Sequence, residues 1–94
     1  MEVASDDDAI VTVCSALGNE KRLRLLNALR ETAGGTLRDV HAETSDVTGL
    51  SHRESTHTYL EELVDAALVE KTRNDSGGVV YETDVSELTL SFAD

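Results

Sequence analysis

The chain has 94 residues, enough for one small domain with a modest core, so we expect a single domain over residues 1–94. Nineteen acidic residues against eight basic ones give a net charge of −11, which is unusual for a protein that binds nucleic acid. No apolar run has the length of a membrane span and no segment has the pattern of a signal peptide, while a single cysteine excludes an internal disulfide. We therefore expect a cytoplasmic protein that does not contact membranes.

The composition of the charged residues is biased. Only two of the eight basic residues are lysines, Lys21 and Lys71, and the chain has one Ile, one Phe and no Pro. This composition resembles that of proteins from salt-accumulating halophilic archaea, which keep acids at the surface and lose lysines. In molar salt the self-repulsion of such a charge is screened within about 3 Å, so the resemblance implies a protein that works in high salt. The alternative is an ordinary acidic protein without a nucleic-acid role, because net charge does not determine the fold.

The first predicted helix runs from Ser5 to Gly18. Ser5 and Asp8 have the spacing of a capping box, and Gly18 is a typical helix end. Its apolar face carries Ile10, Val13, Cys14 and Leu17. A lone cysteine on such a face is usually buried and inert, and the alternative is a redox switch between two copies of Cys14.

The second and third helices are predicted from their caps. Asn19 can cap the second helix, and Gly34 ends it. Thr36 and Asp39 repeat the capping-box spacing and open a third helix, followed by a predicted turn over residues 44–49. The second helix holds a basic cluster of Lys21, Arg22, Arg24 and Arg30, in which Arg22 is expected to be structural.

The fourth helix and the segment after it indicate the fold. Residues 51–67 are predicted as a helix opened by a capping box at Ser51 and Glu54, with an apolar face of Leu60, Leu63, Val64, Ala67 and Leu68. An alternating segment, a Gly-containing turn over residues 74–78 and a second alternating segment follow. This order is typical of the recognition helix and wing of a winged helix-turn-helix. We therefore predict a mainly α fold of four helices with a small β-hairpin wing over residues 69–84.

The end of the chain has two interpretations. Leu88, Leu90 and Phe92 alternate at period two, which predicts a third strand. Val85, Leu88 and Phe92 could instead share one face of a helix. The pattern does not decide between strand and helix over residues 85–94.

Two phrases resemble ArsR-type winged-helix repressors. Residues 16–29, ALGNEKRLRLLNAL, are similar to the family's "A-L-G/S, polar, R-L-x-I/L-L", and residues 59–69, YLEELVDAALV, are similar to its "H-L-x-x-L-x-x-A-G-L-V". Ala67 stands where the family usually has Gly, and MarR-like groups share the second phrase. The resemblance covers roughly residues 10–84. It implies a homodimeric transcriptional regulator that binds a pseudo-palindromic operator and dimerises through its first helix and C-terminal segments.

The sequence departs from the family pattern in three places. Residues 37–42 lack the Cys-x-Cys motif of the metal-sensing members, so no metal or other cofactor is expected. The predicted turn over residues 44–49 is longer than the usual three or four residues. Residues 85–94 do not show the long C-terminal dimer helix of many members.

A DNA-contacting surface follows from the winged-helix prediction. The N-terminal half of the recognition helix reads bases, and the wing and the preceding helix reach the backbone. The candidate DNA-binding residues are His52, Arg53, Ser55, Thr58, Tyr59, Lys71, Arg73 and Arg38. Arg53 can pair with guanine, but it can instead form a salt bridge with Glu54 or Glu20. Lys71 and Arg73 can instead be charges that guard a solvated edge strand.

Other interpretations of the same surfaces remain open. The resemblance implies a dimer interface formed by Ile10, Val13, Cys14, Leu17, Leu90 and Phe92. The acids of the fourth helix, Glu54, Glu61, Glu62 and Asp65, could form a docking face for a basic protein partner, which is the alternative to DNA binding. A metal site that includes His52, Glu54, His57 and Glu61 has little support, because only His57 and Glu61 have helical spacing. No pattern for catalysis is present, so we expect no enzyme.

Overall fold

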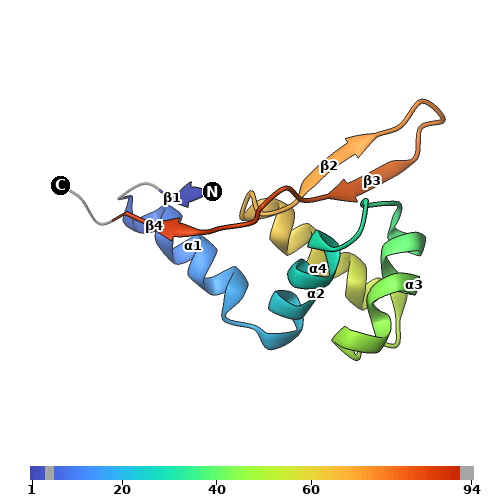
Figure 1. Ribbon diagram of the computed structural model, residues 1–94, viewed down its shortest axis with the longest axis horizontal. Helices are drawn as coiled ribbons and strands as arrows, with labels where there is room; N and C mark the ends of the chain where they lie inside the picture. Colours follow the sequence, from blue (N-terminus) through green and yellow to red (C-terminus); the bar gives the residue numbers. More distant parts are fainter. Residues whose placement is uncertain (4–5, 92–94) are drawn as a thin grey trace.

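The computed structural model describes residues 1–3 and 6–91. Four helices and an antiparallel hairpin follow one another in the predicted order (Figure 1). The helices are α1 (Asp7–Leu17), α2 (Glu20–Arg30), α3 (Leu37–Thr48) and α4 (Arg53–Asp65), and the strands are β1 (Glu2–Val3), β2 (Glu70–Arg73), β3 (Val79–Glu82) and β4 (Thr89–Leu90). The predicted mainly α fold with a small β-hairpin is confirmed.

Two of the four predicted caps are present. The side chain of Asn19 accepts from the Arg22 N–H at 3.0 Å, and the Thr36 hydroxyl oxygen accepts from the Asp39 N–H at 3.3 Å. The cap of α1 is Asp6, whose carboxylate accepts from the Asp8 N–H. Ser5, predicted for that role, lies outside the described residues.

The predicted start of α4 is wrong by two residues. The helix begins at Arg53, and His52 occupies the cap position without a side-chain hydrogen bond to the helix. The capping box of Ser51 and Glu54 is therefore not formed. Its sequence spacing alone could not reveal that the extended backbone persists through His52.

The predicted turn over residues 44–49 is also wrong, because α3 continues to Thr48. The Thr44 hydroxyl donates to the Val40 carbonyl at 2.8 Å, which satisfies this buried polar group inside the helix. Gly49 ends α3 with a φ of 74°, and its N–H donates to the Ser45 carbonyl. The connection to α4 is therefore only residues 49–52, and the apparent departure from a short helix-turn-helix turn disappears.

The core lies where α2, α3, α4 and the wing meet (Figure 1). Its most completely buried apolar side chains are Leu25, Leu29, Val40, Leu60, Leu63 and Leu68. Ala67 was predicted to belong to this face but is exposed, and Ala66 is buried in its place. The reason is that α4 ends at Asp65 and Ala67 adopts a φ of 61°, a conformation that favours glycine. This is the position where the resembled family usually has Gly.

The wing is anchored to the connection between α2 and α3. In the hairpin, Lys71 lies opposite Tyr81, and Arg73 lies opposite Val79. Gly35 and Tyr81 exchange two backbone hydrogen bonds of 3.0 and 2.8 Å. This bridge fixes the base of the wing against the start of α3.

The last described segment is extended. β4 pairs in parallel with β1, with Val3 opposite Leu90, beside α1 and away from the hairpin (Figure 1). The strand interpretation is therefore correct at Thr89 and Leu90, whereas Phe92 lies outside the described residues. Within residues 1–3 and 6–91, no helix has the length and apolarity needed to cross a membrane.

Candidate nucleic-acid interface

The N-terminal half of α4 presents most of its predicted contact residues to solvent. His52, Arg53 and Thr58 are exposed, and Ser55 is half-buried. Between them Thr56 is fully buried, and its hydroxyl lies 2.7 Å from Nδ1 of His41 on α3. The sequence did not single out this contact, which joins the two helices of the helix-turn-helix from their buried sides.

Arg53 is exposed, and its guanidinium forms no salt bridge among the described residues. Its predicted alternative partner Glu20 pairs instead with Arg24, one turn along α2. Arg38, in the first turn of α3, is exposed as well. Both arginines therefore present donors that a phosphate or a base edge could accept.

Tyr59 packs against the core, unlike the exposed candidates His52, Arg53 and Thr58. Its ring is half-buried against the core, and the guanidinium of Arg22 lies 5.5 Å from the ring centre. Arg22 also donates to the carbonyls of Ala16 at 2.7 Å and Ser15 at 3.1 Å, and it pairs with Glu62. The structural role expected for Arg22 is thus present. A DNA contact by Tyr59 stays a prediction.

Glu61 lies beneath the wing and connects three elements. Its carboxylate accepts from the Tyr81 hydroxyl at 2.6 Å and from Lys71 Nζ at 3.0 Å, and His57 Nε2 lies 3.8 Å away. The Tyr81 and Lys71 hydrogen bonds lower the pKa of Glu61, while burial and the neighbouring carboxylate raise the pKa of Tyr81. This contact was not predicted from the sequence. The one sequence feature that points to it is Tyr81 on the apolar face of a predicted strand, because a buried tyrosine hydroxyl requires a hydrogen-bond partner.

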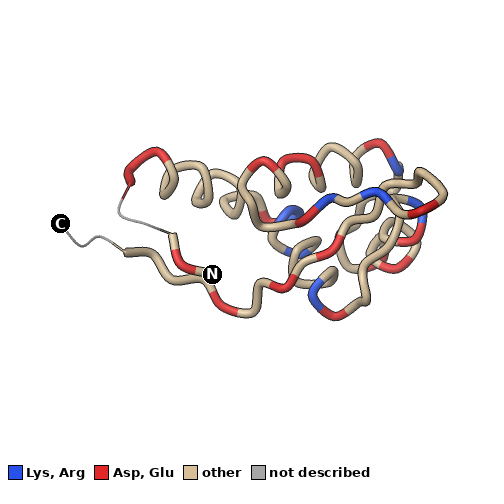
Figure 2. The backbone as a smooth tube through the Cα atoms, turned by 90° about the horizontal axis from the view of Figure 1, so that it is seen from above, with Lys and Arg blue, Asp and Glu red and all other residues tan. Residues whose placement is uncertain are grey.

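The cations of the wing lie on β2 (Figure 2). Lys71 is held at Glu61, whereas Arg73 is directed to the wing tip, where it donates to the Gly77 carbonyl at 3.2 Å. The side chain of Asn74 accepts from the Gly78 N–H at 2.8 Å and orders the turn.

An open groove of about 390 Å³ separates the wing from α3 and α4. Arg38, His57 and Lys71 line it together with Thr36, at the first turn of α3. Three side chains that carry or can carry positive charge thus line one groove beside the first turn of α3. Lys71 and His57 also contact the carboxylate of Glu61, whereas Arg38 forms no ion pair among the described residues. This arrangement suits an anion such as a backbone phosphate.

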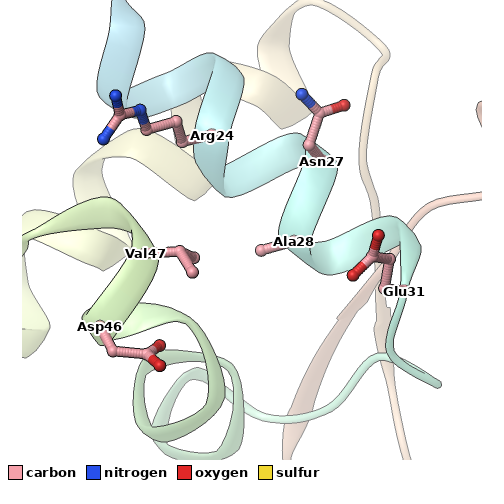
Figure 3. A pocket seen from close by; sticks show the side chains of 6 residues that line it. All are labelled: Arg24, Asn27, Ala28, Glu31, Asp46 and Val47. Carbon is pink, nitrogen blue, oxygen red and sulfur yellow. The ribbon is translucent and has the colours of Figure 1, made fainter.

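A second open pocket, of about 520 Å³, lies between α2 and α3 (Figure 3). Its walls carry Arg24, Asn27, Ala28, Glu31, Asp46 and Val47. Arg24 is already paired with Glu20, and the remaining charges are acidic. The pocket therefore offers no comparable site for an anion. No group of three metal-ligating side chains occurs in the part of the chain that the structure describes.

The predicted dimer residues are not equally accessible. Val13 is 4% exposed and packs within the protomer, while Ile10, Leu17 and Leu90 are half-buried. Cys14 is exposed and therefore not part of the protomer core, because Val13 and Ala16 form the inward face of α1; its place in a dimer interface stays a prediction. Val11, which the sequence pattern did not single out, is 61% exposed.

The fold matches solved winged-helix structures. The homodimeric winged helix-turn-helix DNA-binding domain Mb0332 from Mycobacterium bovis, described as a possible ArsR-family regulator, superposes with a TM-score of 0.64 at 23% identity, over 83% of this chain and 66% of that one. NolR from Sinorhizobium fredii gives 0.62 at 22% identity, over 84% and 72%. The ferric uptake regulator of Vibrio cholerae gives 0.61 at 17% identity, over 80% and 63%.

The chain thus has a winged-helix fold. It spans about two thirds of the length of these chains. No protein-family model matches the chain, and no curated protein matches it by sequence. These similarities, all below 25% identity, establish the fold and leave the function to be argued from the surface.

Proposed function

We propose that the protein is a sequence-specific DNA-binding transcriptional regulator that acts in the cytoplasm as a homodimer and not as an enzyme. The observation that carries the proposal is the groove in which Arg38, His57 and Lys71 converge between α3, α4 and the wing. In this proposal α4 enters the major groove through Arg53 and its neighbours, and the wing follows the backbone or the minor groove.

The acids of α4 oppose this proposal less than the sequence suggests. Glu61 pairs with Lys71, and Glu62 pairs with Arg22. Of the acids in the second half of the helix, only Asp65 is exposed without a cationic partner among the described residues. Glu54 is also exposed without such a partner, but it lies near the opposite end of α4 from Asp65. A basic protein partner would need a continuous free acidic face, so the pairing of Glu61 and Glu62 favours DNA over that alternative.

The small number of basic residues on this surface is consistent with a protein that works in high salt. We propose that the protein works in molar salt, where its charge of −11 is screened within about 3 Å. Counterion release contributes little there, so binding depends on base contacts and on fit more than on a basic surface. The few unpaired basic side chains of the surface are then sufficient for DNA binding.

Dimerisation would place two recognition helices on one duplex. The exposed residues Val11 and Cys14 on the outer side of α1 support a contact with a second copy. Two protomers related by a twofold axis would read a pseudo-palindromic site with half-sites about one helical turn apart.

The test is binding to duplexes selected by the protein from a random-sequence pool in about 0.5 M and about 2 M KCl. Specific binding that survives the higher salt, and that fails in a combined Arg53→Ala, Lys71→Ala, Arg73→Ala variant, supports the proposal. Failure of the folded wild-type protein to enrich any duplex at either salt would contradict it. The matched control is Arg24→Ala, which removes an exposed arginine of α2 that is paired with Glu20.

A further inference from the structure

Glu61 is held in place independently of Lys71. The Tyr81 hydroxyl donates to one carboxylate oxygen at 2.6 Å, and the Tyr81 side chain is buried at 3% exposure. The backbone of Tyr81 is itself fixed by its two hydrogen bonds to Gly35. The carboxylate is therefore a stationary negative charge at the base of the wing.

Lys71 is the movable partner of this pair. Its ammonium lies 3.0 Å from the second carboxylate oxygen, and its side chain is 39% exposed on the rim of the groove. A lysine has a long flexible stem and a compact charge, so it can leave the carboxylate for a nearby phosphate without moving the backbone. When Lys71 leaves Glu61, the carboxylate keeps the Tyr81 hydrogen bond and has His57 Nε2 at 3.8 Å, but no other ammonium or guanidinium in the described residues pairs with it.

We propose that Glu61 is a positioning residue that lowers the salt dependence of DNA binding by exchanging Lys71 for a solution cation. The inference rests on the proposed DNA-binding function. When Lys71 binds a phosphate, one condensed cation leaves the DNA. When Lys71 leaves Glu61, one cation from solution takes its place at the carboxylate. The two events cancel, so this contact contributes nothing to the net number of cations released.

The exchange predicts a specific pattern in the slope of log K against log salt concentration. In Glu61→Gln the amide oxygen still accepts from Tyr81, but no cation is taken up, so the slope becomes steeper by about 0.9 per protomer. Over a tenfold change in salt this amounts to an additional loss of affinity of about eightfold per protomer. Lys71→Gln leaves the slope unchanged in the wild-type background and makes it shallower by about 0.9 in the Glu61→Gln background.

The experiment measures the fluorescence anisotropy of a duplex selected by the wild-type protein, from about 0.2 to about 2 M KCl. The proteins compared are the wild type, Glu61→Gln, Lys71→Gln and the double variant. The control is Glu62→Gln, which removes the same charge from the next residue of α4 but frees Arg22, on the side of α2, and not the wing. Circular dichroism confirms that each variant is folded.

The outcomes separate this inference from the function on which it rests. A steeper slope in Glu61→Gln, reversed by Lys71→Gln and absent in Glu62→Gln, supports the exchange. Equal slopes in the wild type and Glu61→Gln, or an equal steepening in Glu62→Gln, would overturn the exchange while leaving DNA binding intact. If the folded wild-type protein selects no duplex at any salt concentration, both the exchange and the proposed function are wrong.

Discussion

Gly34 occupies a position where the fold leaves no room for a side chain. Its φ is 80°, and an added Cβ would lie 2.7 Å from the Tyr81 carbonyl oxygen and 2.8 Å from the Cβ of Glu82. Neither neighbour is the flexible end of a side chain, so the wing itself would have to shift. Gly34 is therefore required by the close approach of the connection between α2 and α3 to the wing.

We expect Gly34→Ala to lower the free energy of unfolding by about 2–4 kcal/mol, through both backbone strain and the clash. Gly49→Ala is the matched control, because Gly49 has a φ of 74° with no atom within 4 Å of an added Cβ. It should cost only about 1 kcal/mol. Urea unfolding in molar salt measures both, and equal losses would contradict the close contact with Tyr81.

Glu61 also predicts a dependence of stability on pH. Its pKa is lowered below the ordinary 4.5 in the folded protein, mainly by the hydrogen bond from Tyr81. A lowered folded-state pKa contributes stability that is present above about pH 4.5 and lost as the pH falls through the folded-state value. Glu61→Gln should therefore be less stable than the wild type near neutral pH.

This difference between the wild type and Glu61→Gln should shrink as the solution is acidified below about pH 4. Asp65→Asn serves as the control, because it removes an exposed acid of α4 without removing a hydrogen bond from Tyr81. Urea unfolding at several pH values in molar salt tests the prediction. A constant difference at all pH values would show that the ionised Glu61 does not stabilise the fold.

At the scale of elements, Arg22 fixes how α1, α2 and α4 meet. It donates to two backbone carbonyls at the end of α1, pairs with Glu62 of α4 and covers the ring of Tyr59. The planar guanidinium satisfies all of these partners at once, which an ammonium cannot do. Arg22 therefore contributes, together with the shared core, to the orientation of α4 relative to α1.

We expect Arg22→Ala to lower the free energy of unfolding by about 1–3 kcal/mol, because two carbonyls and a carboxylate lose their donor. Arg22→Lys should recover less than half of this loss. Arg24→Ala, which breaks only an exposed pair within α2, should change it by at most about 0.5 kcal/mol. Thermal unfolding compares the three variants, and a similar effect of Arg22→Ala and Arg24→Ala would contradict the structural role of Arg22.

The elements show what periodicity and caps can predict. The order of four helices and a hairpin followed from apolar spacing, since each element buries one face in a shared core. The end of α3 could not be predicted, because Thr44 and Thr48 are typical of turns until a tertiary contact buries them inside the helix. The contact of Glu61 with Tyr81 and Lys71 depends on how the wing folds back, which no local pattern encodes.

At the scale of the whole molecule, the proposed dimer can be tested by a substitution on the outer side of α1. Val11 is 61% exposed there, and exposed Cys14 lies three residues further along the helix. Val11→Asp would bury a charge in the proposed interface, so we expect the dimer dissociation constant to rise at least tenfold. The protomer fold should be unchanged.

Sedimentation velocity at several protein concentrations in molar salt measures this change. Val47→Asp is the matched control, because Val47 is 48% exposed on α3 and belongs to no predicted dimer surface. A wild-type protein that is monomeric at all concentrations, or equal dissociation in both variants, would contradict a dimer formed through α1.

The central claim is that α4 and the wing contact the duplex, and amide hydrogen exchange with and without a selected duplex tests it most directly. We expect slower exchange on DNA binding over residues 53–59 and 71–78 and at the start of α3, with no change in the pocket between α2 and α3. Protection confined to that pocket, or exchange that is unaltered while the duplex is bound, would contradict the assignment of the DNA-reading surface to α4 and the wing.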